Sequence, residues 1–239
     1  MKTPVVSWDT YARKYDMLIQ YNPFYQRLHR QVFDLIKDWQ IDNDNTILDL
    51  GAGTGNYSIR LAQQFPEAQV IHADKDAGMN EVAHDKMIEK GIENLSILES
   101  GVEEMDFPAG SLEAVISIHA LYAFPDPVEA LQKIHSWLRK GGKALLVDAG
   151  RVVNVLDWQL ALAWHFLREY GPAKTWQIFR EGKEVSRQNA YIRQMQKDGV
   201  FWTHSYEEFE QTVRECGFEI LDGGITFRGV SDWVLVRKD

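Results

Sequence analysis

Short apolar runs alternate with helix-like patterns along the middle of the chain. Residues 47–50, 69–73, 95–98, 114–118 and 143–148 are short runs rich in aliphatic side chains, which indicates strands covered on both faces. Between these runs, residues 59–62, 77–90 and 127–138 carry apolar side chains at the spacing of amphipathic helices. Regular alternation of the two patterns predicts a doubly wound parallel sheet with helices on both faces.

The C-terminal part predicts one more helix and a pair of strands. Residues 205–216 begin with the spacing of a capping box and continue with a one-sided apolar stripe, so they read as a helix. Cys216 belongs to that stripe and is expected in the core rather than as a nucleophile. Residues 217–221 and 227–237, arranged around the glycine pair 223–224, read as two closing strands.

Composition narrows the classes of partner. The formal charge is −9 and the isoelectric point is near 5.3, whereas a nucleic-acid surface is usually basic. No apolar run approaches the ~20 residues of a membrane span, and residues 1–15 lack the apolar core of a secretory signal. The single cysteine excludes an internal disulfide. We therefore expect a cytoplasmic protein with a small-molecule partner, no nucleic acid and no membrane.

A glycine-rich turn follows the first predicted strand. Gly51, Gly53 and Gly55 alternate behind residues 47–50 and lead into a helix. Without Cβ atoms the backbone can bend tightly and approach a ligand, and the helix N-terminus points its N–H groups at that ligand. A dinucleotide pattern would need a third glycine where Asn56 stands, and the Gly-Lys-Ser/Thr of a P-loop is absent. A tight turn without any ligand is the alternative.

The same stretch resembles motif I of the class I S-adenosylmethionine-dependent methyltransferases, and it matches the form hydrophobic-Leu-Asp-x-Gly-x-Gly-x-Gly completely. Residues 138–148 resemble the motif that follows the family's fourth helix. The resemblance implies S-adenosyl-L-methionine as cofactor. It also implies a Rossmann-like seven-stranded sheet, mostly parallel, with a C-terminal antiparallel hairpin and a helical cap. The expected single domain comprises an N-terminal cap (1–40), a cofactor-binding core (41–149), a helical insertion or lid (150–202) and a C-terminal helix with strands (203–239).

The resemblance also implies which residues contact the cofactor. In the family the strand-end aspartate, here Asp49, helps orient the methionine part. Asp74 ends the second predicted strand, where a carboxylate can accept both hydroxyls of a ribose. In the adenine loop the usual aspartate position is Gly101, which leaves the Val102 backbone and Glu103 as adenine contacts. The full expected set is Asp49, Gly51, Ala52, Gly53, Gly55, Asp74, Lys75, Met79, Gly101, Val102, Glu103 and His119.

Candidates for catalysis follow the fourth predicted strand. Because ligands of doubly wound sheets bind at the carboxyl ends of strands, His119 and Tyr122 should border the site. A sulfonium is already reactive, so the family's enzymes chiefly align the reactants and exclude water, and a base is needed only for an acceptor proton of high pKa. The catalytic candidates are His119, Tyr122 and Tyr15, with Tyr11, His165 and His204 as further side chains that could assist. The candidate acceptor-binding residues are Tyr11, Tyr15, Tyr122, Arg151, Trp164 and Trp202. No set of residues has metal-ligand spacing, so we expect no metal.

Two segments leave alternatives open. Residues 8–16 resemble an N-terminal helix that folds over cofactor and substrate, but their aromatics could equally pack on the sheet. Residues 150–202 hold an apolar helical stripe, a Gly171–Pro172 break and many aromatics. We favour a lid over the acceptor, because so many aromatics suggest an enclosed pocket. A helical pair packed on the core or on a second subunit is the alternative.

The expected function is in-line methyl transfer to an O, N or C atom of a small, partly apolar molecule. The alternative is a non-catalytic module that keeps the fold for binding or regulation, a reading that the Gly101 departure keeps open. A nicotinamide oxidoreductase is disfavoured by Asn56 and by the absence of a Tyr-x-x-x-Lys set. The sequence leaves the acceptor, the atom methylated and the choice between monomer and homodimer undecided.

Overall fold

One mixed sheet organises the computed structural model, which describes Ala12, Tyr15, Asp16 and residues 19–239. Its strands are β1 (Thr46–Leu50), β2 (Gln69–Asp74), β3 (Leu95–Glu99), β4 (Leu112–Ile118), β5 (Leu138–Asp148), β6 (Phe218–Thr226) and β7 (Ser231–Lys238). They lie in the order β3-β2-β1-β4-β5-β7-β6. The first five strands are parallel, and β7 runs antiparallel to both β5 and β6. This is the expected doubly wound sheet with a terminal antiparallel pair.

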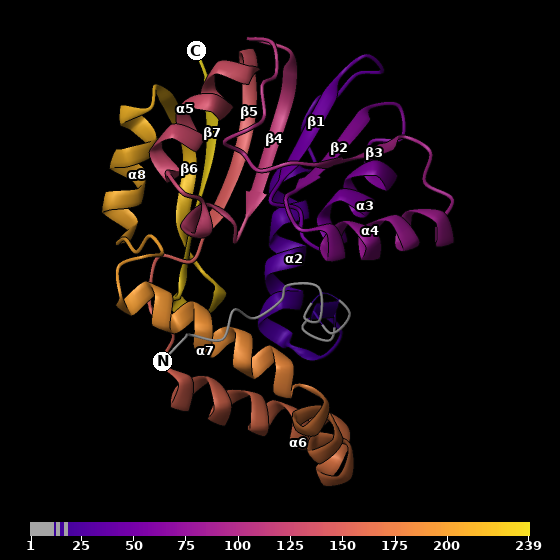
Figure 1. Cartoon of the computed structure of the whole chain (residues 1–239), viewed down its shortest axis with the longest axis vertical. Helices are drawn as coiled ribbons and strands as arrows, with labels where there is room; N and C mark the ends of the chain where they lie inside the picture. The colour runs from indigo at the N-terminus through magenta and orange to yellow at the C-terminus, as the bar shows by residue number, and fades with distance from the viewer. Residues whose placement is uncertain (1–11, 13–14, 17–18) are drawn as a thin grey trace.

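Helices cover both faces of the sheet and give it two cores (Figure 1). On one face, α2 (Pro23–Ile36) and α3 (Asn56–Gln64) pack on strand residues such as Ile47, with α4 (Ala77–Glu89) beside α3. On the other face, α5 (Pro127–Trp137) and α8 (Tyr206–Glu215) pack on Leu48 and its neighbours. Successive residues of β1 therefore enter different cores, since side chains of a strand alternate between faces.

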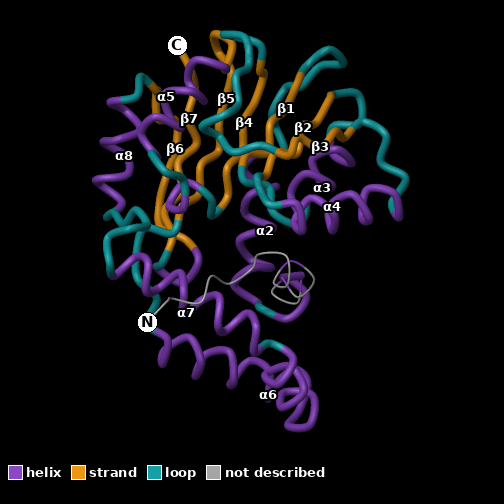
Figure 2. Tube along the Cα trace, viewed as in Figure 1, coloured by secondary structure: helices purple, strands orange, loops and turns teal. Residues whose placement is uncertain are grey.

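The two remaining long helices lie beyond the carboxyl ends of the parallel strands (Figures 1 and 2). α6 (Val155–Glu181) changes direction at Gly171, whose φ of 73° is left-handed. α7 (Lys183–Lys197) follows and contacts α6, and Figure 1 shows it between α6 and the sheet. The predicted helix break at Gly171–Pro172 is confirmed, because the backbone of Gly171 is not helical and separates two helical segments of α6. Within the described ranges, no helix is long and apolar enough to cross a membrane.

Two predicted boundaries were wrong, both at glycines. β5 begins at Leu138, not at residue 143, and Gly142 lies inside it, at a position where a Cβ would meet backbone oxygens at 2.9–3.0 Å. Gly223 and Gly224 lie inside β6 rather than between two strands. A Cβ on Gly223 would lie 2.5 Å from the Tyr206 hydroxyl, so this glycine allows close packing. The actual connection is the short helix η2 (Phe227–Gly229).

Candidate active site

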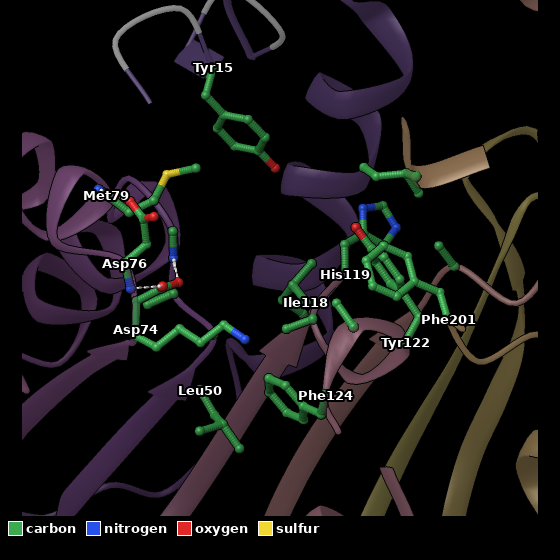
Figure 3. A pocket seen from close by; sticks show the side chains of 18 of the residues that line it. Tyr15, Leu50, Asp74, Asp76, Met79, Ile118, His119, Tyr122, Phe124 and Phe201 are labelled. Atoms are coloured by element: carbon green, nitrogen blue, oxygen red, sulfur yellow. Dashed lines mark hydrogen bonds between the residues drawn. The ribbon is translucent and has the colours of Figure 1, made fainter. Parts of the chain in front are cut away.

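A cavity of about 340 Å³ opens at the carboxyl ends of β1, β2 and β4. Figure 3 shows Asp74, Asp76 and Met79 on one side of it and His119, Tyr122 and Phe201 on the other. We call the first side the glycine-turn wall, formed by Asp49, Gly51, Gly53, Asp74, Met79, Gly101 and Glu103. We call the second the aromatic wall, formed by Tyr25, His119, Tyr122, Tyr191, Ile192, Phe201 and Phe227. Tyr15 lies at the rim between them (Figure 3).

The structure gives a separate reason for glycine at each of the three positions of the turn. All three have left-handed φ angles, between 57° and 76°. A Cβ on Gly51 would meet the Ala120 Cβ at 2.3 Å, and a Cβ on Gly55 would meet the Ala83 Cβ at 2.9 Å. Gly55 therefore allows α3 to pack on α4. It does not line the cavity, although it was predicted among the cofactor contacts. Gly53 does line the cavity and has nothing within 4 Å of its Cβ position, so space for a ligand lies there.

Asp74 ties the turn to the end of β2. One carboxylate oxygen accepts from the Gly53 N–H at 2.8 Å, and the other accepts from the Asp76 N–H at 2.9 Å. Burial raises the pKa of Asp74, and these two hydrogen bonds oppose the rise. A carboxylate oxygen can accept more than one hydrogen bond. Asp74 thus retains acceptor capacity for a pair of hydroxyl groups, as a ribose offers.

Glu103 compensates for the glycine at position 101. A Cβ on Gly101 would lie 2.7–2.8 Å from the Glu103 carboxyl atoms. The Glu103 carboxylate therefore occupies the space into which an aspartate at 101 would extend. Lys133 fixes this loop by donating to the carbonyls of Val102 and Glu103 at 3.0 and 2.8 Å. An acceptor group is thus present on the glycine-turn wall despite the departure from the motif.

Asp49 lies at the base of the same wall and is almost completely buried. Its Oδ2 is 2.5 Å from the Ser58 hydroxyl, which is in turn 2.8 Å from His72 Nδ1. Ser58 and His72 are missing from the predicted set, although a helical serine and a strand histidine flank the glycine turn in the sequence. Burial raises the pKa of Asp49 to about 7.

On the aromatic wall, His119 has a strained backbone and a neutral ring. Its φ of 57° is rare for a residue with a Cβ, and its backbone N–H donates to the Val147 carbonyl at 2.7 Å. The ring lies 2.8 Å from the Ser231 hydroxyl and packs on Phe227, with centroids 4.8 Å apart. Burial lowers the pKa of His119 to about 4. The imidazole is therefore uncharged at neutral pH, and one of its two ring nitrogens carries no proton.

The two candidate tyrosines also line the cavity. Burial raises the pKa of Tyr15 to about 12 and raises that of Tyr122 well above its usual value. Both therefore keep their hydroxyl protons at neutral pH and act as hydrogen-bond donors rather than bases. The Tyr122 backbone N–H donates to buried Asp148 at 3.0 Å, which holds this residue at the end of the sheet.

Several predicted site residues are placed elsewhere or are otherwise engaged. Arg151 lines the cavity, but its guanidinium donates to Asp232 at 2.9 and 2.5 Å and to the Gly229 carbonyl at 2.7 Å. Trp164 is 72% exposed on the outer face of α6, and Trp202 packs on His204. Neither tryptophan lines the cavity, and His165 lies beside Phe166 and Tyr170 in α6. Tyr11 lies outside the described residues.

A buried charge cluster behind the aromatic wall was not predicted. His204 lies between Asp148, at 3.2 Å, and Asp232, at 3.3 Å, and Arg151 pairs with the same Asp232. Burial opposes a charge on His204, but the hydrogen bonds to both carboxylates outweigh it and raise its pKa to about 9. The strand order brings the two carboxylates together: Asp148 ends β5 and pairs in register with Asp232, the second residue of the antiparallel β7.

No cluster of three or more potential metal ligands occurs among the residues that the structure describes. The side chains that converge on the cavity are instead carboxylates, hydroxyls, one neutral imidazole and aromatic rings. Such a set suits an organic cofactor on one wall and a largely apolar reactant on the other.

The chain is similar in sequence to known methyltransferases. Residues 47–142 match a family model described as a methyltransferase domain. Over 208 residues, the chain is 24% identical to a protein named demethylmenaquinone methyltransferase from Listeria monocytogenes serotype 4a (strain HCC23), covering 81% of this chain and 76% of that protein.

Solved structures share the fold. A SAM dependent methyltransferase from Aquifex aeolicus superposes with a TM-score of 0.63 at 13% identity, covering 95% of this chain and 97% of that one. A Haemonchus contortus phosphoethanolamine N-methyltransferase 2, in complex with phosphomonomethylethanolamine and S-adenosylhomocysteine, superposes with a TM-score of 0.64 at 14% identity. The match covers 96% of this chain and 57% of that one.

Proposed function

We propose that this chain is a class I S-adenosylmethionine-dependent methyltransferase and that it methylates a small, uncharged aromatic acceptor held against the aromatic wall. The observation that carries this proposal is the composition of that wall, where aromatic and aliphatic side chains surround a neutral histidine. An apolar reactant gains free energy by leaving water for such a surface, whereas a charged one would lose hydration without a partner.

The glycine-turn wall fits the cofactor. We assign the space over Gly53 to its methionine part, the Asp74 carboxylate to the ribose hydroxyls, and Val102 with Glu103 to the adenine edge. When bound, S-adenosylmethionine supplies a methyl group already activated on a sulfonium. The protein's own contribution is alignment of the reactants and exclusion of water by the rings opposite.

The aromatic wall argues against a phosphorylated or acidic acceptor. Arg151, which also lines the cavity, already donates three hydrogen bonds to Asp232 and Gly229. A phosphate would have to displace Asp232 from that guanidinium. The Listeria relative's name, demethylmenaquinone methyltransferase, points the same way. We therefore propose a hydroxylated aromatic ring, such as a reduced quinone, as the acceptor class.

His119 has the protonation state that such an acceptor requires. Methylation of a ring carbon or hydroxyl releases one proton as the new bond to the methyl carbon forms. The neutral imidazole has one unprotonated nitrogen to take it. The Ser231 hydroxyl and the Phe227 ring hold the imidazole in place, and the protonated hydroxyls of Tyr122 and Tyr15 can donate to the acceptor's oxygen.

The test begins with calorimetric binding of S-adenosylmethionine, S-adenosylhomocysteine and NAD, with Asp74→Ala as the variant. We expect the first two to bind, NAD not to bind, and the variant to lose binding. Methyl transfer is then measured with a reduced 2-alkylnaphthoquinone, a simple catechol and phosphoethanolamine.

We expect turnover with the ring acceptors alone, a KM raised at least tenfold by Phe201→Ala, and a kcat lowered by His119→Gln. Turnover with phosphoethanolamine but not with the rings would overturn the acceptor class. Cofactor binding without turnover on any ring would favour a role in binding or regulation.

A further inference from the structure

A chain of buried polar side chains lies beneath the glycine turn, and the proposed reaction does not use it. Asp49 Oδ2 lies 2.5 Å from Ser58 Oγ, Ser58 Oγ lies 2.8 Å from His72 Nδ1, and His72 Nε2 lies 3.1 Å from Asn80 Oδ1. Asp49, Ser58 and His72 are at most 1% exposed. Since bulk water does not reach them, the contacts themselves determine where the protons lie.

Asn80 fixes the protonation of one histidine nitrogen. Its amide nitrogen donates to the Asp74 carbonyl at 3.1 Å and to Glu99 at 3.4 Å, so its amide oxygen faces His72. A carbonyl oxygen only accepts, and His72 Nε2 must therefore carry a hydrogen. Burial lowers the pKa of His72 to about 4. A neutral imidazole has one N–H, so Nδ1 is left as an acceptor for the Ser58 hydroxyl.

Ser58 then has no hydrogen left for Asp49. A serine hydroxyl donates once, and here it donates to His72. The 2.5 Å contact between Ser58 and Asp49 therefore needs a hydrogen from the carboxyl group. Two facing groups favour this arrangement of charges: Asp74 disfavours a carboxylate at Asp49, and Lys86 disfavours an imidazolium at His72. Tyr57 also faces Asp49, and its own pKa is raised by burial, so it stays uncharged.

We propose that Asp49, Ser58 and His72 form a proton relay that makes Asp49 a neutral acid in the free protein and a carboxylate when a cation binds at the glycine turn. The O–H bond of Asp49 breaks as its proton passes to Ser58 Oγ, and the original hydroxyl proton of Ser58 passes to His72 Nδ1. The products are a carboxylate, a hydroxyl that donates to it and an imidazolium. The number of protons on the protein does not change, so none has to leave the buried site.

The relay places a negative charge on Asp49 only when a cationic ligand is present to pair with it. The amino group of S-adenosylmethionine and its sulfonium are both cations, and this inference rests on the proposed function, which assigns the methionine part to the space over Gly53. Without a ligand, an ionised Asp49 would be a second buried carboxylate near Asp74. Ser58 and His72 act through Asp49, so they are positioning residues rather than catalytic ones.

The free protein provides the first test, without any variant. Nitrogen NMR of the His72 ring should show a neutral imidazole protonated at Nε2, and infrared spectroscopy should show a carboxylic acid band that Asp49→Asn removes. Adding S-adenosylhomocysteine, which keeps the cationic amino group, should convert His72 to imidazolium and abolish that band. An imidazolium already present in the free protein, or a His72 spectrum unchanged by the ligand, would overturn the proposal.

Proton release on binding provides the second test. Calorimetry with S-adenosylhomocysteine at pH 6, repeated in buffers of different ionisation enthalpy, should show no net proton release by the native protein. Ser58→Ala breaks the relay, so we expect about one proton released and an affinity that falls about fivefold between pH 7 and pH 6, given the Asp49 pKa of about 7. Ser117→Ala is the matched control, because it removes another fully buried hydroxyl that donates to the Leu50 carbonyl at 3.0 Å, outside the relay.

Equal proton release by the native protein and Ser58→Ala would refute the relay. Failure of S-adenosylhomocysteine to bind the native protein would instead refute the cofactor assignment and the ligand response with it. The protonation states measured in the free protein would then still decide the first half of the proposal.

Discussion

Replacing Gly51 by alanine tests how closely the glycine turn is packed against the segment after β4. The new Cβ would lie 2.3 Å from the Ala120 Cβ, well inside the 3.4 Å at which ordinary contacts begin. The backbone φ of 72° adds about 1 kcal/mol of strain for an alanine. Overpacking costs about 1–3 kcal/mol more. We therefore expect Gly51→Ala to lower the free energy of unfolding by about 2–4 kcal/mol.

Gly53→Ala is the matched comparison, because Gly53 has a similar φ of 57° but nothing within 4 Å of its Cβ position. It should cost only the strain, about 1 kcal/mol, while its methyl group occupies space at the cavity and weakens S-adenosylhomocysteine binding at least tenfold. Comparing Gly51→Ala with Gly53→Ala therefore distinguishes the effect of core packing on stability from the effect of ligand contact on binding.

Urea unfolding followed by circular dichroism measures both variants, together with the double variant Gly51→Ala/Ala120→Gly. Removing the Ala120 methyl relieves the clash, so the double variant should be about 1–2 kcal/mol more stable than Gly51→Ala alone. The reasoning would be refuted if Gly51→Ala cost no more than Gly53→Ala, or if the double variant showed no recovery.

Four further predictions concern the charged groups. Asp74→Asn should weaken S-adenosylhomocysteine binding about 10–100-fold, because an amide accepts fewer hydrogen bonds; calorimetry measures this, and an unchanged Kd would exclude Asp74 from the ligand. Glu103→Ala should weaken the same binding about tenfold, and Gly101→Asp added to it should restore affinity if the two positions are interchangeable. Asp49→Asn should stabilise the free protein above pH 7. Burial raises the pKa of Asp49 in the folded protein to about 7, from 3.8, so the stability that its protonated form contributes is full below pH 3.8 and is lost as the pH rises to 7. The amide of the variant does not titrate and shows no such loss. Melting temperatures of Asp49→Asn and the native protein should therefore diverge between about pH 4 and pH 7. The pKa of His204 is raised from 6.5 to about 9 in the folded protein. The stability that the charged imidazole contributes, at most roughly 3 kcal/mol, is therefore full below pH 6.5 and is lost as the pH rises through 9. His204→Gln should remove this alkaline loss of stability, and an equal loss in the variant and the native protein would contradict the prediction.

The sheet and one wall of the site were predictable because their signals are local. The apolar runs, the cap at Asp126 and the turn at residues 51–55 each act within a few residues of the sequence. The motif that carries the glycine turn is also contiguous, so Asp49 and Asp74 were placed correctly on the cavity. Gly55 was predicted among the cofactor contacts but does not line the cavity, because a glycine that admits a ligand and one that admits a neighbouring helix look the same in sequence.

The aromatic wall was less predictable because distant segments build it. Tyr25, Tyr191, Phe201 and Phe227 come from four separate parts of the chain and meet only through the tertiary fold. Trp164 was assigned to the acceptor by its aromatic character alone, yet the direction of α6 turns it outward. Sequence periodicity tells which residues share a helical face, but not what that face contacts.

The place of β7 in the sheet has a consequence for biosynthesis. Although it follows the other six strands in the sequence, β7 lies between β5 and β6. On the ribosome, β5 therefore remains an unpaired edge, and β6 has no neighbour, until residues 231–238 emerge. Unpaired edges invite association with other nascent chains. The same strand brings Ser231 to His119 and Asp232 to His204, so the sheet and the aromatic wall are completed in one late step.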